Sequence, residues 1–169
     1  MPSISNQLLV NAVLRVEHMG LNEHAQLADE IHAQQPNLLF SVLALQGFGA
    51  TLEQMEVVLM LLMVFHEAMK ASGKEWPVIS EDVQDRGLKR ISARARFAEG
   101  LPAKQQARAA SDTIANHPEQ PMLAYVFGKF GQHDLLGIET ETQKMLMLAA
   151  LNLVECIALT APKTKGRSQ

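Results

Sequence analysis

The stretch VVLMLLMVFHE, residues 57–67, places a histidine and a glutamate directly after nine apolar residues in an unbroken run. A membrane-spanning helix needs about 20 apolar residues, so this run is too short to cross a bilayer. A helix that is apolar on every side must instead be surrounded by protein. We therefore expect this stretch to lie in a helix at the centre of a soluble domain.

A second run of the same kind, MLMLAALNLVE at residues 145–155, also ends on a glutamate. A shorter similarity links QQPNLLF at 34–40 with EQPMLAY at 119–125, where a proline begins an expected helix in each case. We interpret residues 1–76 and 77–160 as an internal duplication, with the two long apolar helices packed together about a pseudo-twofold axis. The alternative is that helix pairs with a proline in the first turn resemble each other by chance.

Helical spacing of apolar residues accounts for most of the rest of the chain, and no segment shows the alternation of a half-buried strand. Ser, Thr and Pro residues mark helix starts, and glycines mark several helix ends. The fold class is therefore all-α, a helical bundle or helical-repeat domain of about eight helices formed by residues 1–160. The predicted helices cover residues 4–17, 22–34, 36–46, 52–72, 81–99, 103–116, 121–131 and 139–159.

Two segments fall outside this helical pattern. GKEWPVIS, residues 73–80, contains a glycine and a proline and is expected to join the two halves. APKTKGRSQ, residues 161–169, has little apolar content and is expected to form a flexible C-terminal tail.

The composition indicates a soluble protein of a reducing compartment. Hydrophobic residues make up 47% and charged residues 20%, which is typical of globular domains. The single cysteine, Cys156, can form no intramolecular disulfide, and the N-terminus does not show the pattern of a secretion signal. We therefore expect a cytoplasmic protein that does not enter a membrane.

The charge is small overall but unevenly distributed. The net charge is −3, yet residues 86–108 hold seven bases against one acid, while residues 1–72 are acidic. A basic helix face could bind phosphates or the acidic half of a second copy. Because the segment lacks aromatics for base stacking and a recognition-helix motif, we favour a solvated face or a protein contact over nucleic acid. The candidate basic face consists of Arg86, Lys89, Arg90, Arg94 and Arg96.

Two glutamates are the leading candidates for a polar site, because Glu67 and Glu155 each follow a long apolar run. A carboxylate in apolar surroundings needs a partner or has a raised pKa, and such groups serve as acids and metal ligands. The alternative is that both glutamates reach water, since each lies in the last turns of its helix. The candidate polar site consists of Glu67, Glu155, His66, Asp29 and His32.

A metal site has less support. Asp29 and His32 have the i, i+3 spacing that places two ligands on one helix face. A carboxylate-bridged di-metal bundle needs a second pair of this kind, and the sequence contains only one. We therefore expect neither a metal nor another cofactor, and interpret the histidine-rich segment around this pair as a polar surface.

Catalytic motifs are missing from the sequence. It contains no G-x-S-x-G elbow, no phosphate-binding loop and no dinucleotide-binding turn, and Cys156 lies in an apolar run that favours a buried thiol. We expect a helical protein-binding or regulatory module that self-associates as a homo-oligomer and has no catalytic site. Aromatic residues near loops and helix ends would mark the protein contact if they are exposed: Phe48, Trp76, Phe97 and Phe130.

Two alternatives stay open. The first is a metal-binding protein or metal-dependent helical-bundle enzyme that uses Glu67, Glu155 and histidines. The second is a nucleic-acid-binding protein that uses the basic helix at residues 86–96.

Overall fold

The computed structural model describes residues 1–164 and confirms the all-α fold class. All eight predicted helices are present near their predicted bounds, and a short 3-10 helix, η1 (Ala44–Phe48), continues the third. The α-helices are α1 (Asn6–Glu17), α2 (Leu21–Gln34), α3 (Pro36–Leu43), α4 (Leu52–Ala71), α5 (Glu81–Glu99), α6 (Ala103–Asn116), α7 (Gln120–Gln132) and α8 (Glu141–Leu159).

The two long apolar helices begin in the same way. Thr51 before α4 and Thr140 before α8 each accept a hydrogen bond from the backbone of the glutamine three residues later, and that glutamine bonds back to the threonine N–H. Such a capping box satisfies backbone donors that the first helical turn leaves free. Local sequence therefore sets where both central helices start.

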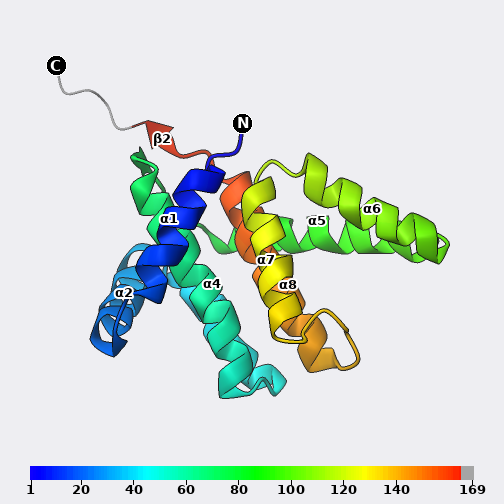
Figure 1. The fold of residues 1–169 in the computed structure, drawn as a ribbon, viewed down its shortest axis with the longest axis horizontal. Coiled ribbons are helices and arrows are strands. Elements are labelled where there is room, and N and C mark those ends of the chain that lie inside the picture. Colours follow the sequence, from blue (N-terminus) through cyan, green and yellow to red (C-terminus); the bar gives the residue numbers. More distant parts are fainter. Residues whose placement is uncertain (165–169) are drawn as a thin grey trace.

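The helices α4 and α8 contact each other and supply much of the buried core. α1 packs across α4, and α5 packs across α8, so each central helix has one principal partner from its own half (Figure 1). These contacts follow the order that an internal duplication predicts. The duplication itself stays a prediction.

Hydrogen bonds also tie each half to the segment that precedes the first helix of the other half. Gln35, at the start of α3, bonds through its side chain to the backbone N–H of Ile79, just before α5. Glu119, at the start of α7, accepts hydrogen bonds from the backbone N–H groups of Ser3 and Ile4, just before α1. The segments held in this way also match in sequence, PSIS at 2–5 and PVIS at 77–80.

Two short strands lie outside the helical pattern. β1 (Lys74–Glu75) lies in the segment expected to join the halves, and it pairs antiparallel with β2 (Lys163–Thr164), which lies in the segment expected to be a flexible tail. Two residues per strand are too few for a periodic pattern to reveal. The rest of the predicted tail, residues 165–169, lies outside the described residues.

Among residues 1–164, one helix, α8, is long and apolar enough to cross a membrane. Half of its most apolar window is buried inside the molecule, against α4, α5 and α7. A core helix of a soluble protein has these properties.

Candidate functional site

Glu67 is a buried member of an ion-pair network. It lies in α4 with 7% of its surface exposed. Its Oε2 accepts a hydrogen bond from Arg15 Nε of α1 at 3.3 Å, and its Oε1 accepts one from Lys70 Nζ at 2.8 Å. Lys70 also donates to Glu30 of α2 at 2.9 Å. Burial alone would lower the pKa of Lys70, but its bonds to the two glutamates raise it above its ordinary value, so Lys70 stays charged.

His66 lies beside this network with only 3% of its surface exposed. Its Nε2 is 3.4 Å from Glu30 Oε2, but neither ring nitrogen makes a hydrogen bond with the described part of the chain. Burial lowers the pKa of this imidazole, and the nearby glutamates do not compensate. His66 is therefore neutral at pH 7, with one N–H donor and one acceptor available.

Glu155 is the buried carboxylate of the second half, with 2% of its surface exposed in α8. Its Oε1 accepts hydrogen bonds from Arg94 of α5 and from His117 Nε2, the latter at 2.8 Å. His117 Nδ1 accepts the backbone N–H of Glu119 at 3.0 Å, which places the imidazole proton on Nε2. Burial would raise the pKa of Glu155, but the bonds from His117 and Arg94 lower it below its ordinary value. Its Oε2 is buried and has no partner among the described residues.

The two leading candidates are thus buried, and the alternative that they reach water is wrong. Glu67 and Glu155 have separate partners, and no described residue bonds to both. His66 lies in the Glu67 neighbourhood, whereas Asp29 and His32 are exposed on α2, where the ring of His32 meets Phe40 edge-on. Within residues 1–164, no three side chains of His, Cys, Asp or Glu lie close enough together to hold a metal ion.

The basic face divides into two parts. All five bases are exposed, but Arg94 also reaches across to the buried Glu155, whereas Arg86, Lys89, Arg90 and Arg96 form no ion pair with a described residue. Sequence reasoning did not identify Arg15, Arg94 or His117 as partners of the glutamates. A buried carboxylate requires a basic or hydrogen-bonding partner. The sequence did contain a signal for these partners, because the first helix of each half carries an arginine in its second half, Arg15 in α1 and Arg94 in α5.

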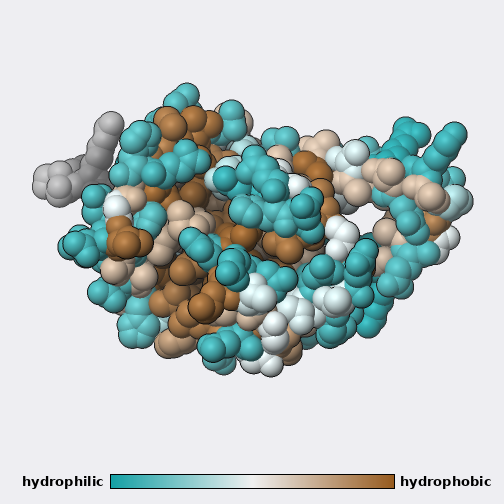
Figure 2. Space-filling model, turned by 60° about the horizontal axis from the view of Figure 1, so that its bottom comes forward, coloured by the Kyte–Doolittle hydropathy of each residue, from teal (hydrophilic) through white to brown (hydrophobic). Residues whose placement is uncertain are grey.

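A large pocket opens on the second half. We call residues 86–116, most of α5 together with α6, the arm, because it projects from the rest of the molecule (Figure 1). The arm pocket lies between the arm and helices α7 and α8 and has a volume of about 680 Å³. Figure 2 shows an opening between the arm and the body of the molecule. The pocket is largely apolar and its lining includes Phe97, Ile114, Phe127, Leu151 and Glu155.

In the first half, α2 holds the place in helix order that α6 holds in the second half, and the two helices differ in burial. The helix α2 packs against α4 and buries Leu27 and Ile31, whereas α6 buries none of its residues. Phe97 is 74% exposed at the arm pocket. Of the other aromatics named above, Phe48 is exposed, Trp76 is half-buried and Phe130 is buried in the core.

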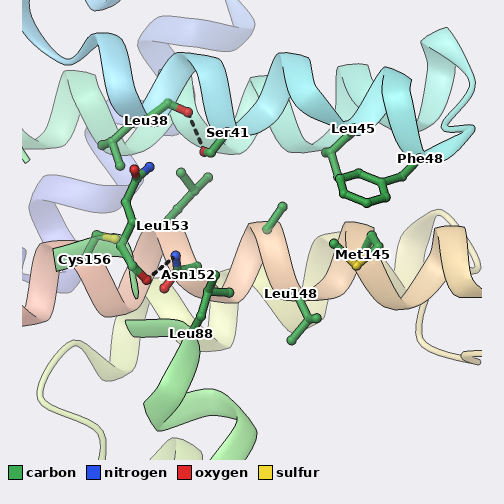
Figure 3. A pocket seen from close by; sticks show the side chains of 12 residues that line it. Leu38, Ser41, Leu45, Phe48, Leu88, Met145, Leu148, Asn152, Leu153 and Cys156 are labelled. Carbon is green, nitrogen blue, oxygen red and sulfur yellow. Dashed lines mark hydrogen bonds between the residues drawn. The ribbon is translucent and has the colours of Figure 1, made fainter. Parts of the chain in front are cut away.

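A smaller pocket of about 120 Å³ lies between α3, α5 and α8 (Figure 3). Asn152 projects into it and donates to the backbone carbonyl of Gln84 at 3.1 Å, while its Oδ1 has no partner among the described residues. Cys156 also lines this pocket, and burial, with the nearby Glu155, raises the pKa of its thiol to about 12. The thiol is therefore protonated at neutral pH, so it is not a nucleophile.

Comparisons with protein-family models, with curated proteins and with solved structures found no match for this chain. The function must therefore be inferred from the residues and their geometry.

Proposed function

We propose that this protein is a helical binding module without a catalytic site, and that it self-associates through the arm. The observation that carries the proposal is the open arm pocket. Its walls are apolar, α6 buries no residue, and Phe97 stands exposed at its edge. A contiguous apolar surface of this kind typically marks a contact with another protein.

The charge distribution supports a second copy of the chain as the partner. The arm contains seven basic and two acidic residues and has a net charge of +5, while the whole chain has −3, so the remainder has −8. The acidic remainder includes a groove of about 390 Å³ between α1, α4 and α7, which we call the acidic groove. Its lining holds three acids, Glu17, Glu53 and Glu56, against one lysine, Lys129, and one histidine, His133. It also includes apolar residues such as Val57 and Met60.

Arm and acidic groove complement each other in charge, and both present apolar surface. If each arm lies across the acidic groove of the other copy, the two contacts are identical and the assembly closes as a symmetric dimer. The exposed bases of α5 would then face carboxylates, and Phe97 would lose its exposure to water. The pairing also gives a role to the seven basic residues of the arm, which projects from the body (Figure 1).

The alternatives have less support from the geometry. Glu67 and Glu155 are already neutralised by basic partners, which disfavours a metal-dependent enzyme built on them. The exposed bases of α5 could also bind nucleic acid. The measurement of molar mass and polyanion binding described below distinguishes this alternative from self-association. The single buried cysteine fits the cytoplasmic location that we propose for the protein.

The test is the molar mass of the purified chain, measured by sedimentation equilibrium over a wide range of concentration. We expect a concentration-dependent dimer that Phe97→Gln shifts toward monomer. Leu21→Gln is the matched control, because Leu21 is 89% exposed at the start of α2, on neither of the two surfaces. A monomer at every concentration would refute self-association. Monomers that bind polyanions with a steep salt dependence would favour the nucleic-acid alternative.

A further inference from the structure

His66 is the buried polar group that the proposed function leaves without a role. Only 3% of its surface is exposed. Its Nε2 lies 3.4 Å from Glu30 Oε2, but neither ring nitrogen makes a hydrogen bond with residues 1–164. Buried polar groups in folded proteins are nearly always paired, because an unpaired one costs free energy. A ligand that pairs with the imidazole would remove this cost.

His66 lines a pocket that can hold such a ligand. The His66 pocket has a volume of about 430 Å³ and lies between the ends of α2 and α4 and residues 74–78. This volume is in the range of pockets that bind small molecules, roughly 300–1,000 Å³. Met69, Trp76 and Val78 provide apolar walls. The indole of Trp76 is held in place, since its Nε1 donates to the Met69 carbonyl at 3.2 Å and to Ser72 Oγ at 3.1 Å.

The charged groups of the pocket favour an anion. Lys70 and Lys74 both line it, against one acid, the exposed Glu75. Lys70 is engaged by Glu30 and Glu67. Lys74 is partly buried and forms no ion pair with any described residue. The pocket therefore combines an ammonium group that forms no ion pair with residues 1–164, an aromatic wall and an imidazole that makes no hydrogen bond with those residues.

We propose that the His66 pocket binds a small aromatic carboxylic acid that carries a hydroxyl group. The carboxylate pairs with Lys74, and the ring lies along Trp76 and Met69. The hydroxyl forms a hydrogen bond with His66, either donating to the acceptor nitrogen of the imidazole or accepting from its N–H. The carboxylate, the ring and the hydroxyl of the ligand thus each interact with a different group of the pocket. The site is separate from the arm and the acidic groove and does not depend on self-association.

Trp76 is the only tryptophan in the chain, so its fluorescence reports directly on this pocket. The probe is 4-hydroxybenzoate, and we expect a saturable change in Trp76 emission. Benzoate, which lacks the hydroxyl, should bind roughly tenfold more weakly, the effect of one hydrogen bond to a buried partner. Tyramine has a similar ring and hydroxyl but a positive charge, and it should produce no saturable change.

Two variants and a control locate the site. Lys74→Gln should weaken 4-hydroxybenzoate binding at least roughly tenfold, the loss of one charge-assisted bond. Lys144→Gln, on exposed α8 surface, should leave it unchanged. His66→Phe keeps the ring volume and should abolish the preference for 4-hydroxybenzoate over benzoate, with circular dichroism confirming that the variant is folded. The proposal is overturned if no probe gives a saturable change, if tyramine binds as tightly as 4-hydroxybenzoate, or if Lys74→Gln binds as the parent chain does.

Discussion

Replacing Gly87 with alanine tests the closest approach of two helices in this fold. Gly87 is buried in the middle of α5, where that helix crosses α8. A Cβ added at this position would lie 2.1 Å from Asn152 Oδ1 and 3.2 Å from Glu155 Cβ. The first distance is far inside van der Waals contact. Alanine therefore fits only if Asn152 moves and gives up its hydrogen bond to the Gln84 carbonyl.

Two opposing effects set the size of the change in unfolding free energy. Alanine is about 1 kcal/mol more favourable than glycine in the interior of a helix. Overpacking a filled site costs about 1–3 kcal/mol, and losing the buried hydrogen bond of Asn152 costs about 1 kcal/mol more. We expect a net loss of about 1–3 kcal/mol, which corresponds to a fall in Tm of roughly 2–12 °C for a chain of this length.

Urea unfolding followed by circular dichroism measures this change, and Gly128→Ala is the matched control. Gly128 lies inside α7, and a Cβ there would meet no atom within 4 Å, so the substitution should stabilise by up to about 1 kcal/mol. Adding Asn152→Ala to Gly87→Ala should recover part of the loss, because it removes the clashing atom. If Gly87→Ala proves at least as stable as the parent chain, the close crossing of α5 over α8 is refuted.

Three further predictions concern charge and reactivity. Glu155→Gln should lower the unfolding free energy at pH 7 by about 1–3 kcal/mol. The pKa of Glu155 in the folded chain lies below its ordinary value of 4.5, so the difference between parent and variant should persist above pH 4.5 and disappear as the pH falls through the folded pKa. Urea titrations at several pH values measure this difference. Arg90→Glu should weaken the dimer and Glu56→Arg in the same chain should restore it, whereas two additive losses in sedimentation equilibrium would contradict the contact between the arm and the acidic groove. Cys156, whose thiol pKa burial and Glu155 raise to about 12, should react with Ellman's reagent at pH 8 only after unfolding, and rapid reaction of the native chain would show that the thiol is accessible.

The helices could be predicted because their signals are local, whereas the sequence left open whether the two glutamates are buried or reach water. Thr51 and Thr140 lie next to the helical turns that they cap. A long run of apolar residues likewise predicts directly that its helix is buried. The expectation that a buried carboxylate requires a partner was also correct, since Glu67 and Glu155 both have basic partners.

The identity of those partners could not be predicted, because it depends on how helices cross. Arg94 belongs to a row of regularly spaced bases, and only the position of α8 separates it from Arg90. The strand pair β1–β2 joins residues that are far apart in the chain and has no periodicity to detect. Gly87 was the one available signal for the crossing, since a glycine inside a helical pattern usually has a packing reason.

The arm is open because of the side chains that α6 supplies. Its inward side carries alanines such as Ala109 and Ala110, whereas α2 supplies Leu27 and Ile31 and closes against α4. Small side chains cannot span the distance to α8, so the middle of the arm stands away from the body while its two ends remain attached.

Both attachments meet at Glu155, which bonds to Arg94 in α5 and to His117 directly after α6. One carboxylate thus fixes where the arm leaves the body and where it returns. It follows that the arm keeps a defined position even though α6 buries no residue, and that it can present Phe97 and the exposed bases as a preorganised surface. Loss of the Glu155 charge should therefore weaken self-association, because this carboxylate lines the arm pocket and fixes the position of the arm.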